Sequence, residues 1–129
     1  MIRRSLGRSG ISKPARIVLT HVEPRQRAAP KIEFLYWEGC PSHPEALDLL
    51  QEVLAARGID ARVELREVTT QEEAEALRFP GSPTIRVDGR DVDPAGADGR
   101  PALNCRIYYL PDGTVSPVPT REQLEEALR

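Results

Sequence analysis

A cysteine followed three residues later by a histidine is the clearest chemical feature of this sequence. The run is Cys40-Pro41-Ser42-His43. A thiolate is a strong nucleophile, and free N–H groups and the helix dipole stabilise it at a helix N-terminus. An imidazole one turn away could stabilise the thiolate or accept the thiol proton. The pair therefore predicts nucleophilic thiol chemistry, with an inert, buried Cys40 and a solvent-exposed His43 as the alternatives.

Cysteine and histidine could also bind a metal, and the chain has a second cysteine whose position has to be predicted. No further cysteine or histidine follows Cys40 and His43 closely. We predict no metal site, because a closed zinc site needs four ligands. The second cysteine, Cys105, alternates in phase with Ile107 and Tyr109. That pattern predicts an inward-facing position on a strand, where Cys105 would be an inert core residue.

The elements around Cys40 are expected to form a strand that leads directly into a helix. Residues 32–37 are apolar except for Glu33 and rich in β-formers, which is typical of a buried central strand. Pro41 suits the first position of a helix, and Gly58 suits its left-handed end. In that arrangement Ile59 would fold back onto Leu54, as in a Schellman motif.

The rest of the chain predicts three more strands and two more helices. Alternating apolar residues at 61–65 indicate a second strand, which would be parallel to the first because a helix connects them. Capping-box spacing starts helices after Thr70 and Thr120, the first of which would run to about Arg78. The third and fourth strands are expected at 85–87 and 105–110, on either side of an Asp88-Gly89 turn. The predicted order is β-α-β-α-β-β-α.

Several short segments resemble the thioredoxin-like superfamily. Within it, residues 31–129 are most similar to small bacterial thioredoxin-like proteins that are sometimes linked by name to alkylmercury lyase. The segments that carry this resemblance are Trp37-Glu38-Gly39-Cys40-Pro41, Gly81-Ser82-Pro83-Thr84-Ile85, Asp88-Gly89-Arg90-Asp91 and Cys105-Arg106-Ile107-Tyr108. The resemblance implies a thioredoxin-like α/β fold, with a mixed four-stranded sheet and flanking helices.

The resemblance also assigns expected roles to individual residues. Cys40 takes the nucleophile position, and Pro83 is expected to be a cis-proline beside it. Ser82 would present backbone to a bound thiol or peptide, and Trp37 would line the same binding site. His43 stands where dithiol members of the superfamily have a resolving cysteine. A strand starting at Cys105 would begin at the opposite edge of the sheet, too far from Cys40 for a disulfide.

Two functions are consistent with these expectations. In the first, the chain is a monothiol thiol–disulfide oxidoreductase: Cys40 forms a mixed disulfide with a low-molecular-weight thiol or a protein thiol, and an external thiol resolves it. In the second, the protein keeps the fold without catalysis and binds a thiol, a peptide, or a soft metal or organomercurial. Neither function calls for a cofactor. The oligomeric state is left open.

Charge and composition bound these expectations. Residues 1–30 hold seven basic residues against one acidic residue, whereas residues 31–129 hold eleven against nineteen. We predict a disordered basic arm at 1–30 and one folded domain at 31–129. Nucleic-acid binding is not expected, because the arm lacks aromatic residues and the domain is acidic. No apolar run is long enough for a membrane span or typical of a secretion signal, which favours a cytoplasmic location.

Overall fold

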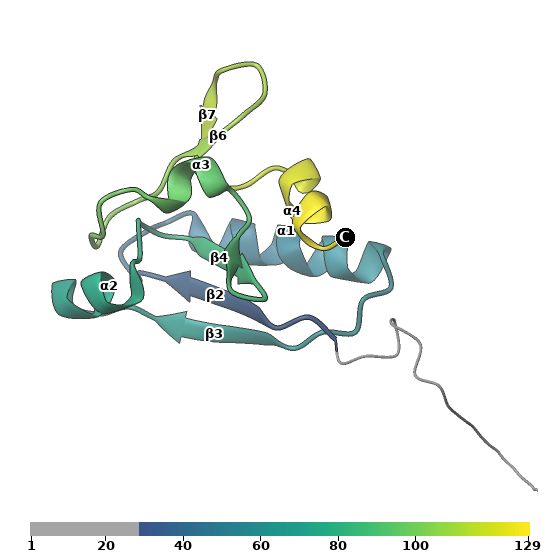
Figure 1. The fold of residues 1–129 in the computed structure, drawn as a ribbon, viewed down its shortest axis with the longest axis horizontal. Coiled ribbons are helices and arrows are strands. Elements are labelled where there is room, and N and C mark those ends of the chain that lie inside the picture. The colour runs from purple at the N-terminus through teal and green to yellow at the C-terminus, as the bar shows by residue number, and fades with distance from the viewer. Residues whose placement is uncertain (1–28) are drawn as a thin grey trace, which may run out of the picture.

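A four-stranded mixed sheet forms the centre of the computed structural model, which describes residues 29–129 (Figure 1). The strands lie in the order β3-β2-β4-β5. Their bounds are β2 (Ile32–Tyr36), β3 (Val63–Glu67), β4 (Thr84–Val87) and β5 (Arg90–Asp91). Strand β2 pairs parallel with β3 and antiparallel with β4, and β5 pairs antiparallel with β4. The prediction of an α/β fold with a mixed four-stranded sheet is confirmed.

Helices pack around this sheet. Their bounds are α1 (His43–Ala56), α2 (Gln71–Leu77), α3 (Pro94–Ala97) and α4 (Arg121–Ala127). Figure 1 shows α1 running across one face of the sheet with α4 next to it, and the two helices are in contact. The short α3 was not expected from the sequence, which suggested only a loop there. A small hairpin of β6 (Tyr108–Tyr109) and β7 (Val115–Ser116) projects from the body (Figure 1).

The central strand β2 is buried on both of its faces, as its nearly continuous apolar sequence predicts. Ile32 and Phe34 point into a core cluster that includes the apolar face of α1. Leu35 points the opposite way, into a smaller cluster with Val68 and Phe79. Strand β2 therefore joins two cores, and its carboxyl end delivers the chain to Cys40.

The predicted helix ends are confirmed where local chemistry decides them. Gly58 has a φ of 66°, and the Ile59 N–H donates to the Leu54 carbonyl at 2.9 Å, as in a Schellman motif. At the start of α4, the Thr120 hydroxyl accepts from the Gln123 N–H while the Gln123 side chain accepts from the Thr120 N–H. This is the predicted capping box.

Two local predictions were wrong. Helix α1 begins at His43 rather than at Pro41, because a turn after β2 uses the residues up to Cys40 and Pro44 takes the place in the first helical turn. Leu65, expected to face inward, is 56% exposed. Strand β3 lies at the edge of the sheet, with a neighbouring strand on one side only, and alternation there did not produce burial of Leu65.

The predicted fourth strand was also wrong. Residues 105–110 do not pair beside β4; instead β5 follows the Asp88-Gly89 turn at once and takes that edge. Asp88 and Gly89 have φ values of 53° and 83°. Positive φ at both central residues is typical of a type I′ two-residue hairpin, which pairs the strands directly on either side of it. The adjacent strand β5 therefore occupies the edge of β4 where residues 105–110 were expected.

The predicted arm at 1–30 lies outside the described residues except for its last two. All helices and strands of the described part fall within the predicted domain, 31–129.

Candidate functional site

Cys40 lies in the turn that connects β2 to α1. Its backbone N–H donates to the Trp37 carbonyl at 3.0 Å, which closes the turn. Gly39 lies directly against the Trp37 indole: a Cβ at position 39 would come within 2.5 Å of a ring atom. The absence of a side chain at Gly39 therefore lets the indole pack over the turn. The Cys40 residue itself is only 1% exposed.

The thiol of Cys40 has two hydrogen-bonding neighbours. The Sγ atom donates to the Ser82 carbonyl at 3.3 Å and accepts from the Ser42 N–H at 3.4 Å. The first contact holds the thiol proton, whereas an N–H directed at sulfur would also stabilise a thiolate. The Cys40 sulfur is therefore held between one backbone acceptor and one backbone donor.

Ser82 links the Cys40 turn to the start of β4. Its hydroxyl accepts from the Trp37 N–H at 3.0 Å, and its carbonyl accepts the Cys40 thiol. The Ser82–Pro83 peptide bond is cis, as expected from the resemblance. The structure therefore brings together four of the predicted site residues, Trp37, Cys40, Ser82 and Pro83.

His43 occupies a different position from the one predicted. Its ring stacks on Tyr36, with centroids 4.7 Å apart and planes at 28°. Among the described residues it forms no hydrogen bond with Cys40. The stacking follows from the short turn between β2 and α1, which places the last residue of the strand against the first residue of the helix. A chemical role for His43 stays a prediction.

Cys105 is close to this site, and two predictions about it were wrong. It is exposed rather than part of the core, and so are its expected strand companions Ile107 and Tyr109. It also lies beside Cys40's neighbour Ser82 rather than at the opposite edge of the sheet. Cys105 pairs with Ser82 in a parallel bridge. In this bridge the Ser82 N–H donates to the backbone carbonyl of Asn104 and the Arg106 N–H donates to the backbone carbonyl of Ser82, each at 2.8 Å.

The raised pKa of Cys105 reflects the same placement. Partial burial of the sulfur raises it most, followed by a hydrogen bond with the Cys40 thiol and the charge of Cys40. The contacts of both cysteines with Ser82 place them in the same part of the fold.

A buried arginine fixes the segment that carries Cys105. Arg106 forms a bidentate ion pair with Asp91, at 2.7 and 2.8 Å, and it also donates to Thr84 and to the Asp93 carbonyl. Burial opposes the charge of Arg106, but the hydrogen bonds and charge of its partners outweigh it and raise the pKa of the guanidinium. Because Arg106 is directed inward, its neighbour Cys105 faces outward.

Tyr108 extends this anchor toward Pro83. Its ring lies under the Arg106 guanidinium, 4.4 Å from ring centroid to Cζ, and its hydroxyl donates to the Pro83 carbonyl at 2.6 Å. Burial raises the pKa of Tyr108, so the hydroxyl stays protonated as a donor. The segment 106–108 is thereby tied to the residues that follow Ser82.

Sequence reasoning missed Arg106, Asp91 and Tyr108 as positioning residues. Both segments that contain them had been singled out by the resemblance, but without a role. The available signal in the sequence was the spacing of Arg106 and Tyr108, which are two positions apart, together with the earlier Asp91. Alternate residues of an extended segment share a face, so Arg106 and Tyr108 would face inward together.

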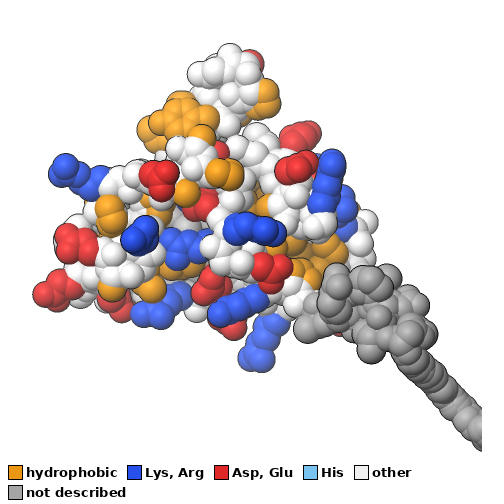
Figure 2. Space-filling view, viewed as in Figure 1, with side chains coloured by type: hydrophobic (Ala, Val, Ile, Leu, Met, Phe, Trp, Pro, Cys, Tyr) orange, Lys and Arg blue, Asp and Glu red, His pale blue; other side chains and the backbone are white. Residues whose placement is uncertain are grey.

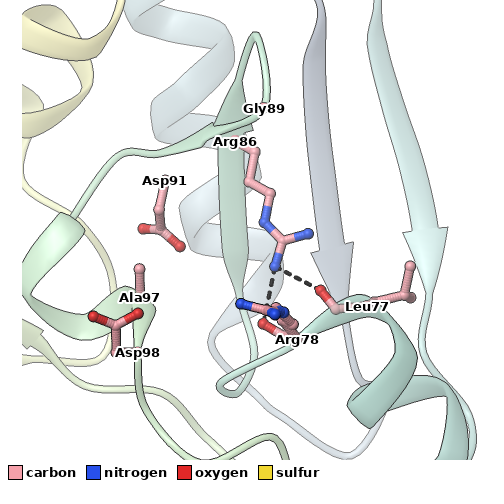
Figure 3. A pocket seen from close by; sticks show the side chains of 7 residues that line it. All are labelled: Leu77, Arg78, Arg86, Gly89, Asp91, Ala97 and Asp98. Carbon is pink, nitrogen blue, oxygen red and sulfur yellow. Dashed lines mark hydrogen bonds between the residues drawn. The ribbon is translucent and has the colours of Figure 1, made fainter.

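One surface pocket has a lining that does not include Cys40. It has a volume of about 290 Å³, and its lining residues are Leu77, Arg78, Arg86, Gly89, Asp91, Ala97 and Asp98 (Figure 3). Arg86 donates to the carbonyls of Leu77 and Arg78 at 2.8 and 3.0 Å. Asp91 is held by Arg106. The pocket's central charged groups thus already have structural partners.

The surface at the β6–β7 hairpin is partly apolar. Figure 2 shows hydrophobic side chains at this projecting hairpin. Ile107, which precedes β6, and Tyr109 and Val115 of the hairpin are about half exposed. Charged side chains of both signs are spread over the rest of the visible face, among apolar and uncharged ones (Figure 2).

Two features are absent from residues 29–129, a cluster of metal ligands and a membrane-spanning helix. In that part of the chain no three side chains of histidine, cysteine, aspartate or glutamate come together as potential metal ligands. No helix there has the length and apolar character needed to cross a membrane. Comparison of the chain with family models, curated proteins and solved structures finds no match.

Proposed function

We propose that this chain is a thioredoxin-like protein that carries out thiol–disulfide exchange through Cys40. The observation that carries the proposal is the contact between the Cys40 thiol and the Ser82 carbonyl, at 3.3 Å. It places a thiol, at a strand-to-helix turn, against backbone from the start of a second strand. An extended thiol or peptide bound there would meet both the sulfur and the polar backbone of residues 82–83.

The proposed reaction is a nucleophilic displacement at sulfur. The Cys40 thiolate attacks one sulfur of a disulfide, a mixed disulfide forms, and the other sulfur leaves as a thiolate. The Ser42 N–H stabilises the attacking anion, while Trp37, Ser82 and Pro83 hold the partner. His43 would assist the proton transfer. The partner class is a low-molecular-weight thiol or a protein thiol or disulfide, and the exchange uses no cofactor.

Burial of Cys40 favours a second candidate, the non-catalytic binding of a thiol, a peptide, or a soft metal or organomercurial. A residue that is 1% exposed is protected from collision with a large disulfide. A binding protein would retain its ligand, whereas an oxidoreductase would turn over. Turnover therefore separates the two candidates.

The experiment uses the reduced full chain, a small mixed disulfide of glutathione as substrate, and coupled glutathione reductase to follow turnover. We expect turnover by the native chain and a loss of at least about tenfold in Cys40→Ser, because a hydroxyl is a far weaker nucleophile than a thiolate. Thermal unfolding of Cys40→Ser serves as the folding control. A folded Cys40→Ser protein with unchanged turnover would overturn the proposal, and stoichiometric uptake without turnover would favour the binding protein.

A further inference from the structure

We propose that Cys105 is the second redox thiol of this site and that Cys40 and Cys105 form an intramolecular disulfide when the protein reacts with a low-molecular-weight disulfide. This inference rests on the proposed exchange function. It makes Cys105 the thiol that first attacks the external disulfide, and it makes Cys40 the thiol that resolves the mixed disulfide in place of an external thiol.

The geometry that supports the proposal centres on Ser82. The Ser82 carbonyl accepts the Cys40 thiol at 3.3 Å and the Arg106 N–H at 2.8 Å. Cys105 immediately precedes Arg106 and is itself paired with Ser82 in a parallel bridge. Bridge partners on neighbouring strands lie about 4.8 Å apart. Both cysteines are thus held against the same residue, from two different segments.

Exposure assigns the two thiols different tasks. Cys40 is buried and Cys105 is exposed, so a disulfide in solution meets Cys105 first. Cys40 then needs to reach only the sulfur of Cys105, and its burial no longer prevents the reaction. The order of events follows from access, since displacement requires the attacking sulfur to contact the sulfur that is attacked.

Partial burial raises the pKa of Cys105 above its ordinary value, and the hydrogen bond and charge of Cys40 raise it further. A raised pKa leaves Cys105 mostly protonated near neutral pH, so we expect its attack on a disulfide to become faster as the pH rises.

The exchange balances in two steps. Cys105 loses its proton to solvent and attacks one sulfur of the disulfide; a Cys105 mixed disulfide forms and one thiolate leaves. Cys40 then loses its proton to solvent, and its thiolate attacks the Cys105 sulfur. The Cys40–Cys105 bond forms and the second thiolate leaves. Two protein thiols are oxidised by two electrons, and one disulfide is reduced to two thiols.

The anchoring of the 104–108 segment makes this pairing reproducible. Arg106 and Tyr108 hold it to Asp91 and Pro83 from the inside. The exposed Cys105 side chain can rotate on this fixed backbone. The anchor is thus the device that keeps a surface thiol within reach of a buried one.

The test is mass spectrometry of the full chain after incubation with oxidised glutathione, acid quenching and alkylation of the remaining thiols. We expect the native protein to lose both thiols, to carry no glutathione, and to yield a cross-linked peptide that contains Cys40 and Cys105. We expect Cys40→Ser to retain glutathione on Cys105, because no internal thiol can displace it. A non-reducing gel reports whether any disulfide joins two chains.

The outcomes distinguish this inference from the proposed function. If native protein retains glutathione on Cys40, and Cys105→Ser turns over as fast as native protein, exchange at Cys40 stands and the role of Cys105 is overturned. Disulfides found only between chains would overturn it as well. If neither cysteine reacts with the disulfide, the proposed function itself fails. Native protein is read out directly, so the conclusion does not depend on the variants folding.

Discussion

The thiol of Cys40 donates a hydrogen bond to the carbonyl oxygen of Ser82 over 3.3 Å, although 42 residues separate them in the sequence. The same carbonyl accepts the backbone N–H of Arg106. Three segments of the chain therefore meet at one backbone group. The site exists only when all three are in place, and the following predictions perturb them one at a time.

Gly81→Ala should displace the segment that carries Cys105. Gly81 has a φ of 129°, and a Cβ there would lie 2.8 Å from the Asn104 side chain and 3.1 Å from the Arg106 Cα. We expect a loss of unfolding free energy of about 1–3 kcal/mol and slower formation of the Cys40–Cys105 disulfide. Urea unfolding followed through Trp37, the only tryptophan, measures the first effect.

Gly113→Ala is the matched control for that substitution. Gly113 also has a positive φ, 91°, but nothing lies within 4 Å of a Cβ at this position. It should lose stability from backbone strain while the disulfide forms at the native rate. Equal effects of both substitutions on disulfide formation would show that the clash with residues 104–106 has no part in positioning Cys105.

Arg106→Met should destabilise the protein severely. Arg106 and Asp91 are almost completely buried, and removal of one partner leaves the other as an unpaired buried charge. Breaking such a pair costs about 3–5 kcal/mol. We expect the double variant Arg106→Met, Asp91→Leu to recover part of this loss, because the Asp91 carboxylate is then no longer buried without its partner.

The control for the ion pair is Arg121→Met. Arg121 contacts Glu52 at 3.3 Å on the surface, where such pairs contribute about 0–1 kcal/mol. Denaturant unfolding of the native protein, the two single variants and the double variant gives the free energies of unfolding to be compared. A loss at Arg106 no larger than the loss at Arg121 would contradict an anchoring role for the buried pair.

Cys40→Ala should lower the pKa of Cys105 toward the ordinary thiol value. The substitution removes the hydrogen bond and the charge of Cys40, two of the causes that raise it, while the effect of partial burial remains. A lower pKa means more thiolate near pH 8, so alkylation of Cys105 should be faster in the variant at that pH. Peptide mass spectrometry of timed iodoacetamide reactions across a pH series measures this, with the denatured protein as reference. Superimposable pH profiles would show that the two thiols do not interact.

His43→Phe and His43→Ala separate packing from chemistry at this position. The stack of His43 on Tyr36 should be retained in His43→Phe and lost in His43→Ala, at a cost of about 0.5–1.5 kcal/mol. Because Phe keeps the stacked ring but not the imidazole nitrogens, we expect His43→Phe to keep native stability and to slow exchange near pH 7. A folded His43→Phe protein with the native exchange rate would show that the imidazole has no part in proton transfer.

Local sequence was sufficient for features whose cause is local. The Thr120 capping box and the Gly58 helix end involve residues within a few positions of each other, and both are present as predicted. The nearly continuous apolar run of β2 predicted a central strand, because burial on both faces favours apolar residues at most positions. The position of Cys40 at the end of this strand follows from the same pattern.

The placement of Cys105 near Cys40 was decided by the tertiary structure alone. Alternation at 105–109 shows which residues share a face but not which face is buried, and the ion pair of Arg106 with Asp91 made the choice by turning Arg106 and Tyr108 inward. The Asp88-Gly89 hairpin then supplied β5 as the neighbour of β4, which left residues 104–106 free to pair with Ser82. Which of two distant segments pairs with a given edge strand depends on the positions of all the other segments. Such pairings are therefore fixed only in the folded chain.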